Sequence, residues 1–175
     1  MAARFSQNGG NAIDAAIAVA SSLCVVEPYM SGLGGVGVCL VYLAEEKQTR
    51  ALNFSGRCPR DINGIVQDDL NSGPLSSLIP GVVSGWNELH QKYGSLEWDS
   101  LFESSIDYAM NGYALTSLGS HVISESRSKL ESNIEASQLI LNNSGKFPKS
   151  GTTIKMPLLG NTLMEISKDS SVFYL

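Results

Sequence analysis

The sequence predicts an α+β fold in which helices and an antiparallel β-hairpin share one domain. Residues 12–20 are apolar on nearly every side except at Asp14, which is typical of a helix inside a core. Residues 36–54 contain two apolar, strand-like segments separated by a polar turn at 45–48, as expected for a hairpin. Residues 79–168 repeatedly place apolar residues at helical spacing.

Size and composition exclude several classes of protein. A chain of 175 residues with 43% hydrophobic residues is long enough to form one core. The net charge is −5 and the basic residues are scattered, so we expect no nucleic-acid partner. Polar residues interrupt every long apolar run, which argues against a transmembrane helix. The first five residues lack the apolar region of a signal peptide, so we expect no targeting signal in this chain.

The first predicted element is a helix over residues 11–23. Asn11 is a favoured N-cap, and Asp14 stands where it can complete a capping box. Glu27-Pro28 ends the segment, because a residue before proline disfavours helix. A glycine-rich turn over 31–37 and a strand over 36–43 follow, and we expect helix, turn and strand all to be buried.

The glycine-rich turn contains the pattern GxGxxG between Gly32 and Gly37. A dinucleotide site requires a strand before the glycines, a helix after them and an acidic residue about 20 positions later. Here the helix precedes the glycines, the strand follows them, and no acidic residue stands at that distance. We therefore interpret the glycines as positions where a buried strand begins close to a neighbouring backbone.

The remaining elements follow from apolar spacing and from glycine, proline and asparagine signals. The second strand of the hairpin, over residues 49–54, leads into an irregular segment and then a polar, turn-rich one. Beyond this we predict a short strand at 74–78, a helix that opens at 79–81 and runs to about 93, and a second helix over 98–110. One or two helices over 116–142, a loop over 142–153 and a last helix over 157–168 follow.

Cysteines and histidines give no sign of a metal centre. Cys24, Cys39 and Cys58 have no CxxC spacing, and the first two fall in apolar elements where a thiol behaves as a small hydrophobe. His90 and His121 stand on separate predicted helices, without a local zinc or Ser-His-Asp motif. We expect each histidine to be solvated or partly buried, and we expect neither a metal nor a cofactor.

Several blocks of sequence together resemble one known family. They are GGNAIDAAIAVA, VVEPYMSGLGGVGVCLVY, ALNFSGRCP and GPLSSLIPGVVSGWNELHQKYGSLEW, followed by YAMNGYALT, FPKSGTTIKMPLLGNTL and FYL. In this order they resemble the gamma-glutamyltransferase (gamma-glutamyltranspeptidase) family over essentially the whole chain. Agreement of four separate blocks is far more specific than one glycine pattern.

The resemblance implies an N-terminal nucleophile hydrolase fold, a four-layer αββα sandwich. Such proteins are made as proenzymes that cut themselves, and the threonine that then begins the small subunit attacks glutathione or another gamma-glutamyl peptide. The expected partners are thus a small-molecule substrate and a small catalytic subunit from the same precursor. Residues 1–175 resemble the N-terminal part of the large subunit, without the family's first strand. We therefore expect no catalytic residue on this chain and no activity of this chain alone.

The resemblance also points to candidate substrate-binding residues. After the strand ALNF the family commonly has an arginine that binds the glutamyl α-carboxylate, for which a planar guanidinium is well suited. Ser55 stands at that position, and an arginine, Arg57, follows two places later. A shift of two residues keeps a side chain on the same face of an extended segment, so Arg57 either replaces the family arginine or is an exposed residue after the strand. We expect Arg60 to be a solvated charge.

Two threonines could be mistaken for the nucleophile. Thr152 and Thr153 lie in a predicted loop with no base or oxyanion donor beside them, so we do not assign them that role. Glycosylation sequons begin at Asn53 and Asn142, and a glycan is plausible only at the second.

Two other functions stay open. One is a related amidase with a non-glutamyl acyl donor, such as a dicarboxylic monoamide. The other is a catalytically inert or truncated homologue that serves as a binding or structural piece. By resemblance alone, we expect the complete protein to be secreted, periplasmic or anchored outside the cell.

Overall fold

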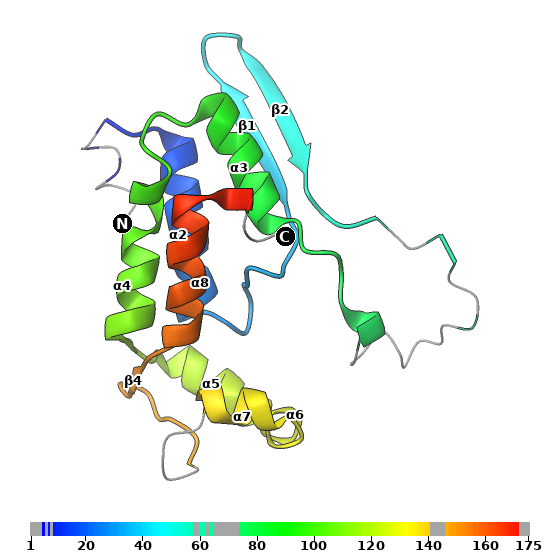
Figure 1. Cartoon of the computed structure of the whole chain (residues 1–175), viewed down its shortest axis with the longest axis vertical. Helices are drawn as coiled ribbons and strands as arrows, with labels where there is room; N and C mark the ends of the chain where they lie inside the picture. The colour runs from blue at the N-terminus through cyan, green and yellow to red at the C-terminus, as the bar shows by residue number, and fades with distance from the viewer. Residues whose placement is uncertain are drawn as a thin grey trace. The chain divides into compact units, whose positions relative to one another are not determined.

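The computed structural model describes residues 5, 7, 9–57, 60–61, 64, 74–140 and 146–171. Two compact units are formed, one by Leu33–Tyr93 and the other by Met1–Gly32 together with Gly94–Leu175 (Figure 1). Within the described part of the chain, no helix combines the length and the apolar character that crossing a membrane requires.

Three helices and a 3-10 helix form the core of the larger unit. Helix α4 (Glu103–Asn111) contacts both α2 (Ala12–Val26) and α8 (Pro157–Lys168), and these lie side by side in Figure 1. The 3-10 helix η3 (Asp99–Phe102) also contacts α2 and α8. Apolar side chains from every one of these elements are fully buried, among them Ile17, Val25, Leu101, Phe102, Ala109, Leu163 and Ile166.

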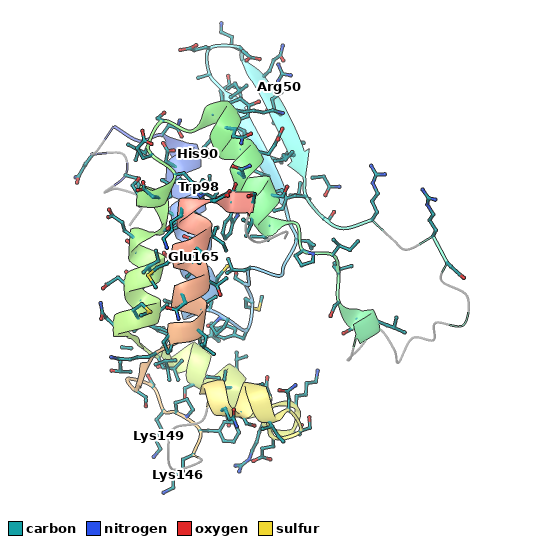
Figure 2. All side chains as sticks on the ribbon, in the orientation of Figure 1. Arg50, His90, Trp98, Lys146, Lys149 and Glu165 are labelled. Carbon is teal, nitrogen blue, oxygen red and sulfur yellow. The ribbon has the colours of Figure 1, made fainter. Side chains whose placement is uncertain are left out.

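Trp98 ties η3 to α8. Its indole nitrogen Nε1 donates to the carbonyl oxygen of Ile166 at 2.8 Å, and its ring meets that of Phe102 edge-on at 4.8 Å between centroids. Figure 2 shows this side chain beside α8. Trp98 is half-buried, and an indole N–H that is shielded from water usually has such a partner, so this contact holds the end of α8 on the core.

The predicted N-terminus of α2 is confirmed. The Asn11 side chain accepts from the backbone amides of Ile13 and Asp14 at 2.8 and 3.2 Å, and Asp14 accepts from the amide of Asn11 at 2.8 Å. The helix runs three residues beyond the predicted end, to Val26, where Glu27-Pro28 stops it.

The segment predicted as one or two helices contains three short ones. Ser126, with φ −85° and ψ 9°, separates the first two. The side chain of Asn133 accepts from the amide of Ala136 at 2.8 Å and so caps the third. One two-residue strand precedes these helices and another follows them, and the sequence predicts neither. The elements are β3 (Tyr113–Ala114), α5 (Ser117–Glu125), α6 (Arg127–Glu131), α7 (Ile134–Ile140) and β4 (Thr153–Ile154), and β3 pairs antiparallel with β4.

The smaller unit contains the predicted hairpin. Strand β1 (Val38–Leu43) pairs antiparallel with β2 (Gln48–Asn53), and Lys47 adopts φ 53° in the turn between them. The helix α3 (Val82–Tyr93) follows later in the same unit, as predicted. It buries Val82, Val83, Trp86 and Leu89.

The expectation that β1 is buried on both sides is wrong for this chain. Val38, Leu40 and Tyr42 are 64%, 72% and 64% exposed, whereas the residues between them are half-buried. The exposed residues pair with Asn53, Ala51 and Thr49 of β2, so one apolar face of the hairpin is uncovered. A nearly continuous apolar run encodes burial on both faces, but the described residues supply a cover for one face only.

Two local predictions also need correction. Residues 74–78 do not form a strand: Pro74–Ser76 is the 3-10 helix η2, because proline lacks an amide donor and its fixed φ suits a tight helical turn. The helix predicted over 98–110 begins instead as η3. There the side chains of Asp99 and Ser100 bond to nearby backbone groups, which favours a tighter turn.

Candidate functional site

The candidate site is the segment that leaves β2. Exposure alternates along it: Asn53, Ser55 and Arg57 are exposed, and Phe54 and Gly56 are half-buried. This is the pattern of an extended chain with two faces. Ser55 and Arg57, the two predicted substrate-binding residues, therefore both belong to the exposed side.

Glycines hold the half-buried side of this segment. A Cβ at Gly37 would lie 2.6 Å from the Phe54 ring, and one at Gly85 would lie 2.3 Å from it. A Cβ at Gly81 would lie 2.0 Å from the Phe54 carbonyl oxygen. The interpretation of the glycine-rich turn as a place of close backbone approach is not borne out by these contacts, because a Cβ at Gly32 or Gly34 would meet nothing within 4 Å and one at Gly37 would meet the side chain of Phe54. The close approach to backbone is at Gly81, just before α3. A side chain added at Gly37, Gly81 or Gly85 would therefore displace Phe54.

Hydrogen bonds join the same parts of the chain. The amide of Phe54 donates to the carbonyl oxygen of Gly37 at 3.0 Å. The carbonyl oxygen of Gly35 accepts from the amides of Gly81 and Val82 at 2.9 and 3.2 Å. Two of the donors at the start of α3 are therefore satisfied within the protein, so these two do not form an anion site.

Ser55 is held by a residue that the sequence analysis did not select. Its backbone amide donates to Asn53 Oδ1 at 2.9 Å, and its hydroxyl donates to the same oxygen. An asparagine whose side chain bonds two residues ahead forms an Asx-turn. The signal was present in the sequence as an Asn at a strand end, where such turns are common.

Arg57 supplies positive charge at this site. It is exposed, and no ion pair links it to another residue in the described part of the chain. A guanidinium presents a planar fork of N–H donors that matches a carboxylate. The next two residues, Cys58 and Pro59, lie outside the described residues, and Arg60 is exposed as predicted.

A hollow between the hairpin and α3 has a different character. It measures about 220 Å³ and includes Arg50 and Lys92 among its lining residues. Arg50 pairs with Glu46 at 2.7 Å and Lys92 with Glu88 at 2.6 Å, so both positive charges are already neutralised. Figure 2 labels Arg50 on β2. This hollow is therefore a weaker candidate for a carboxylate than Arg57.

The surroundings of Cys24, His90, His121 and Thr152 give none of them a catalytic or metal-binding role. Burial raises the pKa of the Cys24 thiol to about 11, so it stays protonated and is a poor nucleophile. His90 is half-buried on α3 and His121 is exposed on α5, as predicted. Thr152 donates and accepts backbone hydrogen bonds with Lys149 and Leu115. Among the described residues, no three His, Cys, Asp or Glu side chains gather as a metal site would require. The sequon at Asn142 lies outside the described residues.

Comparison with known proteins defines the class. The chain superposes on the crystal structure of Helicobacter pylori gamma-glutamyltranspeptidase with a TM-score of 0.91 and 27% identity, covering 99% of this chain and 52% of that one. It also matches cephalosporin acylase from Bacillus halodurans, with a TM-score of 0.82 and 26% identity over 98% of this chain and 34% of that one. The predicted fold class, an α+β chain of the N-terminal nucleophile hydrolase type, is confirmed.

Sequence comparison gives the family. The model of the gamma-glutamyltranspeptidase family matches residues 2–174. The chain is 32% identical to the glutathione hydrolase-like YwrD proenzyme of Bacillus subtilis over 98% of its own length. The chain belongs to the gamma-glutamyltranspeptidase family. It spans 34% of that relative's length, about a third.

Proposed function

We propose that this chain provides the carboxylate-binding part of an enzyme that hydrolyses or transfers gamma-glutamyl groups, with glutathione or a gamma-glutamyl peptide as substrate. The observation that carries the proposal is Arg57, an exposed guanidinium without an ion pair in the described chain, on a segment that glycines fix in place. Membership of the gamma-glutamyltranspeptidase family supplies the reaction class.

The nucleophile in this proposal comes from outside the chain. A threonine at the N-terminus of a small subunit, cut from the same precursor, adds its hydroxyl oxygen to the gamma-carbonyl carbon. Its own amine takes the hydroxyl proton and passes it to the departing nitrogen as the C–N bond breaks. Water or an acceptor amine then attacks the resulting ester and restores the threonine. Curated relatives described as proenzymes support a second subunit.

Arg57 takes part in binding and not in bond breaking. The α-carboxylate of the substrate keeps its charge throughout the reaction, so a bidentate guanidinium holds it equally well before and during the chemical step. Such uniform binding lowers KM and leaves kcat nearly unchanged. This is the kinetic signature that the proposal requires.

The first experiment follows the complete precursor over hours on a denaturing gel and then measures kinetics. We expect two bands, with threonine at the start of the smaller one. Arg57→Ala should raise KM for a gamma-glutamyl anilide about 10- to 100-fold, the effect of losing a hydrogen-bonded charge. The KM of Arg57→Lys should lie between those of the wild type and Arg57→Ala, because lysine keeps the charge but lacks the planar guanidinium. Arg60→Ala is the matched control and should leave KM unchanged.

A single uncut band would instead favour a catalytically inert homologue. An unchanged KM in Arg57→Ala would remove this residue from the substrate site.

The related amidase is the second candidate, favoured by the likeness to a cephalosporin acylase. Gamma-glutamyl, glutaryl and butyryl anilides separate the two functions. The glutaryl compound lacks the α-amine of the gamma-glutamyl compound, and the butyryl compound lacks the carboxylate as well. A gamma-glutamyl enzyme prefers the first, an acylase for dicarboxylic amides prefers the second, and loss of Arg57 should affect only the two that carry a carboxylate.

Location outside the cytoplasm stays a prediction that rests on the resemblance. Cell fractionation of the complete protein, followed by immunoblotting, tests it directly.

A further inference from the structure

Asn53 is the last residue of β2 and pairs with Val38 of β1. Its side chain is exposed, yet Oδ1 accepts two hydrogen bonds, both from Ser55. An exposed amide that bonds forward to the next exposed residue stabilises a particular path of the chain as it leaves the strand. The sequence order Asn53-Phe54-Ser55-Gly56-Arg57 places this turn two residues before the guanidinium.

The hydrogen bonds of Ser55 limit its own chemistry. A serine hydroxyl has one proton to donate, and here that proton goes to Asn53. The backbone amide of Ser55 is engaged by the same oxygen. While this turn persists, Ser55 offers lone pairs but no N–H or O–H to an approaching carboxylate. Arg57 is then the donor that the segment presents.

The segment before Arg57 is fixed on both of its faces. On the half-buried side, Phe54 is enclosed by Gly37, Gly81 and Gly85. On the exposed side, Asn53 holds the backbone of Ser55. Gly56, which directly precedes Arg57, lies close to Ile79: a Cβ at Gly56 would come within 3.3 Å of the Ile79 amide nitrogen. Removing either constraint frees the chain at the position from which the guanidinium extends.

We infer that Asn53 is a positioning residue for substrate binding: its Asx-turn occupies Ser55 and directs the chain so that Arg57 presents its guanidinium to the substrate carboxylate. This inference rests on the proposed function, since it assumes that Arg57 binds that carboxylate. Asn53 itself does not touch the substrate.

The test uses the complete, self-cleaved protein and gamma-glutamyl anilide kinetics. Asn53→Ala should raise KM about 3- to 10-fold, as expected for losing one or two ordering hydrogen bonds, with kcat within about twofold of the wild type. Asn53→Asp should restore most of the affinity, because aspartate forms the same turn. Thr49→Ala, a change at another exposed position of β2, is the matched control and should leave KM unchanged.

A double-mutant cycle separates positioning from general stability. If Asn53 acts through Arg57, then Asn53→Ala should add no further increase in KM to Arg57→Ala. Ser55→Ala should have a smaller effect than Asn53→Ala, because it leaves the bond from the backbone amide in place.

The outcomes distinguish the inference from the proposed function. If Arg57→Ala raises KM but Asn53→Ala does not, the inference is wrong and the proposed function stands. If Asn53→Ala lowers Tm without changing KM, the role is structural only and the inference is again wrong. Additive effects of the two substitutions also contradict it. If Arg57→Ala itself has no effect, the proposed carboxylate site fails first.

Discussion

Cys24, at the residue scale, links protonation to stability. Its side chain is 4% exposed on α2, and burial raises the pKa of the thiol from 9.0 to about 11. The folded protein therefore holds this proton more tightly than the unfolded chain does. The resulting stabilisation is complete below pH 9 and is lost as the pH rises through 11.

We expect the wild type to lose about 2–3 kcal/mol of unfolding free energy relative to Cys24→Ala between pH 8 and pH 11, since one pKa unit corresponds to about 1.4 kcal/mol. Comparing Tm of the two proteins across this range isolates the thiol from lysines and tyrosines, which titrate equally in both. A constant difference in Tm would show that the thiol is not protected in the folded state.

Asp14 carries a second prediction at this scale. Its carboxylate is fully buried and accepts from the amides of Asn11 and Ser95 at 2.8 and 3.1 Å. Asp14→Ala should destabilise the protein by about 3 kcal/mol, because it removes a fully buried carboxylate that accepts from several backbone amides. Asp107→Ala, at an exposed position on α4, should change stability by less than about 0.5 kcal/mol. Thermal unfolding of both variants measures the difference.

Individual residues also mark how far the sequence could be interpreted. Asn11 and Asp14 predicted the start of α2 because capping depends only on neighbours in the chain. The sequence does not predict the role of Asn53 in the turn after β2, because this role depends on the path of the chain that leads to Arg57. Ser55 and Arg57 became candidates through a resemblance to a family, since an exposed serine and arginine carry no local signal of binding.

At the scale of elements, long helices were predicted best. Helix α8 begins and ends where the sequence predicted, because a proline at its start and a regular apolar spacing define it. The strands β3 and β4 contain two residues each, too few for any periodicity to appear. The strand predicted over residues 74–78 is wrong, because a short apolar run alone does not distinguish a strand from a tight helical turn.

The glycines around Phe54 give a prediction about elements. Gly85→Ala should displace the Phe54 ring, lower stability by about 1–3 kcal/mol and raise KM, because overpacking moves the segment that carries Arg57. Gly34→Ala is the control: a Cβ there meets nothing within 4 Å, so we expect neither effect. Tm and steady-state kinetics of the two variants test this directly. Equal behaviour would mean that Phe54 moves freely without affecting binding.

The exposed hairpin face gives a prediction at the scale of the whole molecule. Val38, Leu40 and Tyr42 form an uncharged patch with Ala51 opposite Leu40. Produced alone, the 175-residue chain should therefore self-associate, as exposed apolar sheet faces do. Light scattering coupled to size exclusion should report a mass above 18.7 kDa.

The combined substitution of Leu40→Lys and Tyr42→Thr should reduce this association. Leu158→Lys, which alters an exposed leucine on α8, should not. A monodisperse, cooperatively unfolding monomer of the unmodified chain would contradict the prediction.

Arg57 follows the exposed positions of β2 along the chain, and this bears on how strongly it attracts a carboxylate. Exposure alternates without interruption from Ala51 through Asn53 and Ser55 to Arg57. A cover that extends along these exposed positions as well as over the hairpin would also remove water near the guanidinium. Because attraction between opposite charges strengthens as the surrounding dielectric falls, Arg57 would attract a carboxylate weakly before assembly and strongly after it. The strength with which this site attracts a carboxylate would then depend on whether the apolar face of the hairpin is covered.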